Sequence, residues 1–234
     1  MKTACFFTTL LGLLFTLSLS AQDCKGNLYM TPNAKMQMTI YDKKGKESGV
    51  QTIQVTDVKN NGGTYESTVN TTMADEKGKV ITNGTGAYRC SGGVFSADMK
   101  MFMPQEGTGK TNATEAKMEP IYLEYPAAPS VGQKLKDAEL KMDMNMNGMN
   151  AAIDFKEENR TVAAKESVTS PAGTWEAYVI SYDGYMKIKM AGIGLPASNF
   201  TVKEWFVPGT GIVKSETSKN GKVIGSTLLT SVTK

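Results

Sequence analysis

Three turns of one design recur along the chain and strongly limit how it can fold. Each opens on a polar residue, places glycine where the backbone needs a positive φ, and sets a lysine before the next segment. The three are Tyr41-Asp42-Lys43-Lys44-Gly45-Lys46, Asp75-Glu76-Lys77-Gly78-Lys79 and Ser218-Lys219-Asn220-Gly221-Lys222. Segments joined by such short turns must run antiparallel, because a parallel connection needs a crossover of about a dozen residues.

Stretches rich in β-branched and aromatic residues lie between these turns and have the length of strands. Helical periodicity is nearly absent, and the one short helix that we predict runs from a capping Asn112 to Met118. We therefore expect an all-β fold, a single curved antiparallel sheet or a partly open β-barrel with at most one short helix. The predicted strands are 35–42, 50–59, 64–73, 79–90, 93–103, 138–147, 150–157, 160–169, 174–190, 200–207, 211–218 and 222–232.

The first residues have the features of a cleaved export leader. Lys2 precedes an apolar run of 14 residues from Phe6 to Leu19, and small residues follow up to Ala21. That run is shorter than the roughly 20 residues that span a bilayer, and no later stretch reaches this length. We predict a signal peptide over 1–21, cleavage between Ala21 and Gln22, and a single all-β domain over 22–234 without a transmembrane segment. The protein is then exported to the periplasm or cell envelope, or secreted.

Two cysteines, Cys24 and Cys90, remain after the leader is removed. Two cysteines in an oxidising compartment usually pair, so we predict a structural disulfide between them. In the chain-entropy model such a bridge stabilises the fold by about 4 kcal/mol. The alternative is a redox or metal pair, but neither cysteine belongs to a C-x-x-C motif. Lipidation of Cys24 is not expected, because Asp23 precedes it where a small residue is required.

The absence of histidine excludes several classes of enzyme site. With no histidine among 234 residues, Ser-His-Asp and Cys-His nucleophile systems and the usual zinc sites cannot form. A net charge of +3, without a basic cluster interleaved with aromatic residues, gives no footprint for nucleic acid. We find no catalytic motif and expect no metal and no cofactor. An enzyme that uses carboxylates alone stays open as an alternative.

Methionine is the most distinctive residue type, with 15 in the chain and several M-x-M runs on predicted strands. Flexible thioethers suit an irregular core, which is the interpretation we favour. They also suit an adaptable pocket for a lipid or another apolar small molecule, or a site for a soft metal such as Cu(I). The candidate ligand-binding residues are Met36, Met38, Met99, Met101, Met142 and Met144.

Several turn and corner motifs resemble those of a known family of exported bacterial proteins. They are Cys24, the turn 41–46, Cys90 with Asp98-Met99, Val131-Gly132-Gln133-Lys134-Leu135, Glu166-Ser167-Val168 with Pro171-Ala172-Gly173-Thr174-Trp175, and 205–214. On these residues the chain resembles the TapB-like family of Gram-negative bacteria. The resemblance implies an export signal and a curved β fold, and it supplies no catalytic residue.

We therefore expect an exported cell-envelope protein, a non-catalytic β cradle that binds an apolar ligand or a protein partner that the sequence does not identify. The alternative is a structural or assembly component of the envelope with no ligand cavity. A cradle predicts a cavity lined by Met99, Met101, Met142 and Met144. A structural component predicts that these side chains meet others without a void. A carboxylate enzyme predicts clustered acids in a cleft.

Overall fold

The computed structural model describes residues 24–102, 121–146 and 149–234, which form thirteen strands and three short 3-10 turns. The strands are β1 Lys35–Asp42, β2 Glu47–Asn61, β3 Thr64–Asp75, β4 Val80–Ser91, β5 Val94–Asp98, β6 Tyr122–Tyr125, β7 Ala138–Met146, β8 Met149–Ser170, β9 Gly173–Met190, β10 Ile193–Gly194, β11 Ser198–Val207, β12 Gly211–Lys219 and β13 Lys222–Thr233. The 3-10 turns are η1 Cys24–Gly26, η2 Leu28–Met30 and η3 Met99–Phe102. No α-helix occurs in the described ranges, and the expected helix at 112–118 lies outside them.

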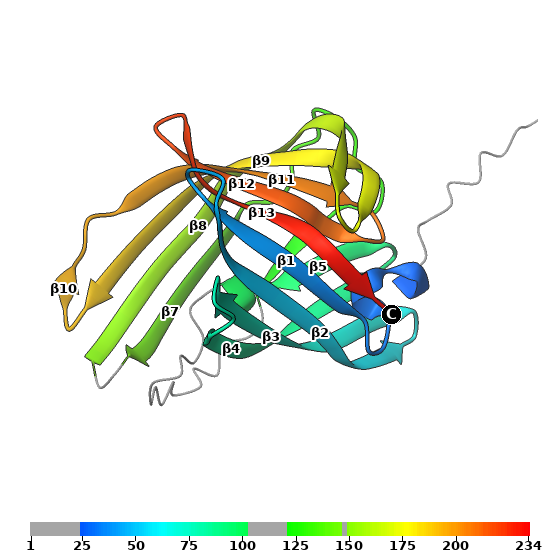
Figure 1. Cartoon of the computed structure of the whole chain (residues 1–234), viewed down its shortest axis with the longest axis horizontal. Coiled ribbons are helices and arrows are strands. Elements are labelled where there is room, and N and C mark those ends of the chain that lie inside the picture. The colour runs from blue at the N-terminus through cyan, green and yellow to red at the C-terminus, as the bar shows by residue number, and fades with distance from the viewer. Residues whose placement is uncertain (1–23, 103–120, 147–148) are drawn as a thin grey trace, which may run out of the picture.

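All strands join one antiparallel sheet in the order β6-β5-β4-β3-β2-β1-β13-β12-β11-β9-β8-β7, with β10 paired to β9. The sheet curls into a nearly closed barrel (Figure 1), and β6 and β7 are its two end strands. Among the described residues no ladder joins β6 to β7, so a seam separates them. The predicted all-β fold, a curved antiparallel sheet or partly open barrel, is confirmed.

Three local predictions differ from the structure. The segments 150–157 and 160–169 form one strand, β8, which carries a β-bulge between Glu158 and Thr161. The strand predicted over 93–103 ends at Asp98, because Met99 begins η3. The short strands β6 and β10 were not predicted, since each lies beside proline and turn residues that resemble a loop.

Aromatic rings fill the interior near the chain's N-terminal residues. Tyr29 of η2 packs against Tyr88 with ring centroids 4.3 Å apart, and Tyr125 stacks on Phe206 at 4.9 Å. Phe95 lies between these pairs. Such contacts add to the free energy gained by burying the rings, so this cluster stabilises the core at the end where the chain's first described residues pack.

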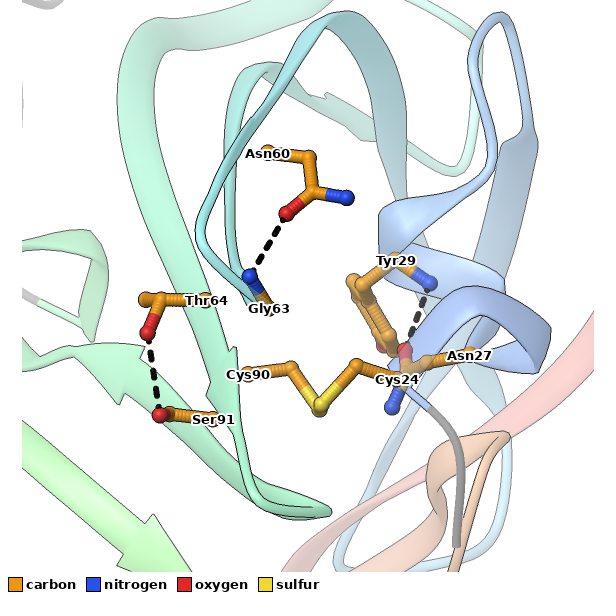
Figure 2. Close-up of a disulfide and its surroundings, with 8 residues drawn as sticks. All are labelled: Cys24, Asn27, Tyr29, Asn60, Gly63, Thr64, Cys90 and Ser91. Carbon is orange, nitrogen blue, oxygen red and sulfur yellow. Dashed lines mark hydrogen bonds between the residues drawn. A yellow bond between two sulfur atoms is a disulfide. The ribbon is translucent and has the colours of Figure 1, made fainter.

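The disulfide between Cys24 and Cys90 ties η1 to β4 beside this cluster, with the two Cα atoms 5.6 Å apart (Figure 2). A backbone hydrogen bond from Leu28 N to Gly209 O of 2.8 Å fixes the same segment to the β11–β12 turn. The first described residues are therefore held against one end of the barrel. No helix in the described part of the chain is long and apolar enough to cross a membrane.

Candidate functional site

Four of the six candidate methionines lie in the packed interior rather than around a cavity. Met36 and Met38 on β1 are buried, as are Met99 and Met101 on η3, and all four belong to the hydrophobic core. Met101 lies directly over Gly86, where any side chain would collide with it. Met142 on β7 is half-buried, and the side chain of Met144 lies outside the described residues. The structure does not bring the six together at one site.

An apolar strip follows the inner face of the sheet where β7, β8, β9 and β11 run side by side. Register places Met142 opposite Ile153, and Ile153 opposite Ile188, so these three side chains share a face. Phe200 covers Gly184 and stacks toward Phe155 with ring centroids 6.4 Å apart. We call this the apolar strip, and its residues are Met142, Ile153, Phe155, Met186, Ile188 and Phe200.

The apolar strip differs from the core in its exposure. Ile153 and Phe155 are buried, whereas Met142, Met186, Ile188 and Phe200 are only half-buried although they pack against the core. The strands that carry them extend away from the rest of the sheet, toward the left in Figure 1. The strip thus presents apolar surface that no described part of the chain fully covers.

A cluster of charged and phenolic side chains lies at the inner end of the apolar strip. Glu157 and Arg160 come from β8, Glu204 from β11, Tyr125 from β6 and Tyr182 from β9. The exposed fractions of the three charged side chains are 2% for Glu157, 1% for Arg160 and 5% for Glu204. The β-bulge explains why both Glu157 and Arg160 point inward, because Asn159 at φ 60° restarts the strand's alternation one residue later.

Arg160 spans the seam between the two ends of the sheet. Its guanidinium donates to Lys136 O at 2.9 Å and to Glu124 O of β6 at 3.3 Å. Its Nε lies 3.4 Å from Glu157 Oε2, and its guanidinium carbon Cζ lies 5.3 Å from the centre of the Tyr125 ring. Arg160 therefore links β8 to β6 and to the segment before β7 by polar contacts.

Glu204 accepts hydrogen bonds from Tyr125 at 2.8 Å and from Tyr182 at 3.1 Å. Burial raises the pKa of Glu204, and the Arg160 charge and the two phenols oppose that rise. Burial and the nearby Glu204 charge likewise raise the pKa of Glu157 to about 8. Both carboxyl groups are buried and contact side chains from several strands, so the geometry fits a structural network that closes the barrel.

A family model matches residues 33–229, which is most of the described chain. The chain belongs to the DUF3108-like family. Among curated proteins none matches it.

Two solved structures share the fold of this DUF3108-like chain. One is a "putative lipoprotein" from Parabacteroides distasonis, 18% identical, with a TM-score of 0.72 over 88% of this chain and 99% of that chain. The other is a "putative exported protein with YmcC-like fold" from Bacteroides fragilis, 22% identical, with a TM-score of 0.69 over 87% of this chain and 97% of that chain. At these identities the likeness establishes the fold.

The DUF3108-like barrel carries two shallow hollows of about 390 and 460 Å³, and Phe200 of the apolar strip is one of the residues that line the larger. Both are lined by Asp183, Thr201 and Ser218, and in the wall of the smaller hollow Asn159 Nδ2 donates to Asp183 Oδ2 at 2.9 Å. None of the six candidate methionines lines either hollow. Within the described residues no three Asp, Glu, Cys or His side chains gather where they could hold a metal ion.

Sequence reasoning missed the charged cluster of this DUF3108-like chain. The residues Glu157, Glu158, Asn159 and Arg160 resemble a polar turn, so the sequence predicts two separate strands here, 150–157 and 160–169. One signal in the sequence could have revealed it. Two predicted strands separated only by Glu158-Asn159 would need a two-residue hairpin loop, and such a loop favours glycine at positive φ, which does not occur there. A bulge within one strand satisfies that sequence better.

Proposed function

We propose that this DUF3108-like protein is an exported, non-catalytic β cradle of the cell envelope whose apolar strip binds a lipid or another apolar ligand. The observation that carries the proposal is the half-exposed apolar strip on the inner face of β7, β8, β9 and β11. Large apolar side chains that stay accessible beside a core are typical of ligand sites. The site differs from the one expected from the sequence, since of the six candidate methionines only Met142 is described within it.

The chemistry of the strip favours a flexible apolar ligand. Met142 and Met186 have unbranched thioether side chains that adapt to different ligand shapes. Because the strip itself carries no charged side chain, a ligand gains free energy there by burying hydrocarbon. A chain that buries about ten methylene groups gains roughly 8 kcal/mol before the entropic costs of binding.

Export is the second part of the proposal. It is supported by the leader over 1–21 with cleavage between Ala21 and Gln22, and by the disulfide between Cys24 and Cys90, which suits an oxidising compartment. The descriptions of the two similar structures, a lipoprotein and an exported protein, agree with it. We further propose that 22–234 folds as a single domain, that the chain is TapB-like within its family, and that it works in the periplasm or envelope.

Titration with cis-parinaric acid, a fluorescent fatty acid, tests the cradle. We expect saturable binding, and we expect Ile188→Gln to weaken it about tenfold. The polar amide would have to lose its hydrogen bonds to water when the apolar ligand covers it, which costs about 1.4 kcal/mol of binding free energy. Lys187→Gln is the matched control, since the neighbouring side chain lies on the other face of β9. Equal affinity of the two variants, or no saturable binding by the unmodified protein, contradicts the proposal.

The structural alternative has one observation in its favour, the dense packing of Met36, Met38, Met99 and Met101. It predicts that protein purified from its own host has, in native mass spectrometry, the mass of the bare chain. The cradle predicts an added mass that is lost when Ile188 is replaced by Gln.

A further inference from the structure

The antiparallel topology gathers the three lysine turns at one rim of the barrel. Gly49 pairs with Asp75, which places the β1–β2 and β3–β4 turns side by side. Asp42 pairs with Gly225, which brings the β12–β13 turn to the same end. The β9–β10 hairpin and the start of β8, which pairs with the end of β9, also lie at this end, at the left in Figure 1. We call these three turns, the β9–β10 hairpin and the start of β8 together the lysine rim.

The charge of the lysine rim is uneven and exposed. Its three turns carry seven lysines, all solvent-exposed, against the acids Asp42, Asp75 and Glu76. Asp42 and Asp75 each accept two backbone N–H groups of their own turn, so these carboxylates are held close to the backbone. The exposed lysines are Lys43, Lys44, Lys46, Lys77, Lys79, Lys219 and Lys222, of which Lys219 donates through Nζ to Ser198 Oγ at 3.2 Å.

The opposite rim carries no charge in its turns. The β2–β3 and β4–β5 turns there are Asn60-Asn61-Gly62-Gly63 and Ser91-Gly92-Gly93. The β8–β9 and β11–β12 turns are Ser170-Pro171-Ala172-Gly173 and Pro208-Gly209-Thr210. The charged turns therefore lie at one rim only, although the overall net charge of the chain is only +3.

Exposed apolar side chains gather at the same lysine rim. Seven large hydrophobic side chains are exposed in the described residues, and six of them lie there, while Val131 lies elsewhere. Ile193 is the most exposed, at 71%. The six are Ile81, Met149, Ile193, Leu195, Val223 and Ile224.

The backbone of the projecting tip is already hydrogen-bonded. Ala191 N donates to Asn150 O at 2.8 Å, and Leu195 N donates to Ile188 O at 2.8 Å. Residues 191–195 can therefore enter a less polar medium without leaving these donors unpaired, which would cost several kcal/mol for each group.

We propose that the lysine rim docks on the surface of an anionic lipid bilayer. Lysine ammonium groups attract lipid phosphates, and the exposed Ile193 and Leu195, on the hairpin that extends beyond the lysine turns, insert between the headgroups. A soluble polyanion would bind through the lysines alone and would gain no binding free energy from the apolar tip at Ile193 and Leu195. The surface is distinct from the apolar strip, and its test does not depend on the cradle.

Vesicle co-sedimentation tests this docking with the protein purified from its own host. We expect binding to vesicles of phosphatidylglycerol and phosphatidylethanolamine, and much weaker binding to phosphatidylcholine. The double variant K219Q/K222Q should lower the partition coefficient roughly thirtyfold. The matched control is K35Q/K59Q, which removes two exposed lysines near the opposite rim.

A second pair of variants separates a bilayer from a soluble polyanion. Ile193→Ser with Leu195→Ser should lower vesicle binding at least tenfold, whereas Val131→Ser should leave it unchanged. Equal binding to neutral and anionic vesicles overturns the proposal. So does a result in which the lysines matter and the apolar tip does not, because that identifies a polyanion as the partner. Circular dichroism of each variant checks that it is folded, and cis-parinaric acid binding without vesicles reports on the cradle separately.

Discussion

The Tyr125 hydroxyl donates a 2.8 Å hydrogen bond to Glu204 Oε2, although 79 residues separate the two in the chain. Tyr125 ends β6, which is the last strand at one edge of the sheet, and Glu204 lies on β11. The bond crosses the interior and, with Arg160, holds the edge strand across the seam. Closure of the barrel therefore depends on a few buried polar contacts, which makes it open to direct tests.

Tyr125→Phe removes the hydroxyl that donates a hydrogen bond to Glu204 and keeps the aromatic ring. We expect the free energy of unfolding to fall by about 1.5–3 kcal/mol, the range for a buried hydrogen bond to a charged group. Urea denaturation measures it. Tyr65→Phe on β3 is the control and should change stability by less than about 0.5 kcal/mol. A Tyr125→Phe protein as stable as the control would show that the bond contributes nothing.

Arg160→Met removes the cation that the two buried carboxylates share. At a pH above about 8, where Glu157 is ionised, breaking such a network on one side typically costs about 3–5 kcal/mol, because the remaining charge stays buried and uncompensated. The double variant Arg160→Met with Glu157→Gln should regain much of this loss. The measurement is a double-mutant cycle in urea, and strict additivity of the two single changes would contradict the network.

Glu157 should make stability fall as the pH rises. Its pKa is about 8 in the folded protein, above the ordinary value of 4.5, so the folded state binds a proton more tightly than the unfolded state does. The stabilisation is complete below about pH 4.5 and is lost progressively as the pH rises through about 8. Unfolding midpoints measured across this range should decline less steeply in Glu157→Gln than in the unmodified protein. Parallel pH profiles of the two proteins would contradict the raised pKa.

The disulfide gives a further prediction. Cys24 and Cys90 are 66 residues apart, and a closed loop of this length stabilises the fold by about 4 kcal/mol in the chain-entropy model. Cys90→Ser should lower the free energy of unfolding by that amount, and a reducing agent should lower that of the unmodified protein equally. An unfolding midpoint that does not respond to reduction would mean that the bridge is absent or carries no constraint.

The sequence predicts this fold well in the segments where the local turn and alternation patterns are strong. Glycine turns such as Lys44-Gly45-Lys46 with alternating strands between them predict antiparallel pairing, and β1 at Lys35–Asp42 matches its predicted range. Local patterns fail where tertiary contacts decide. Met99 and Met101 alternate as in a strand, yet Gly86 leaves room for a turn there to pack down on β4.

The polar network could not be predicted for a similar reason. Glu157 and Arg160 point inward because a bulge at Asn159 shifts the strand by one residue, and their partners Tyr125 and Glu204 come from distant strands. No residue spacing in the sequence indicates that these side chains come into contact. The apolar strip was missed in part, since Met142 was a candidate and Met186 was not, although both lie on it.

Methionine methyl spectroscopy tests the central claim, that the apolar strip is a ligand site, most directly. In protein labelled with ¹³C at its methionine methyl groups, added oleic acid should shift the resonances of Met142 and Met186 on the strip. Those of Met36 and Met99, which are packed in the core, should stay in place. Saturable shifts confined to the strip are the predicted result, and an unchanged spectrum, or shifts of the core methionines alone, would contradict the cradle.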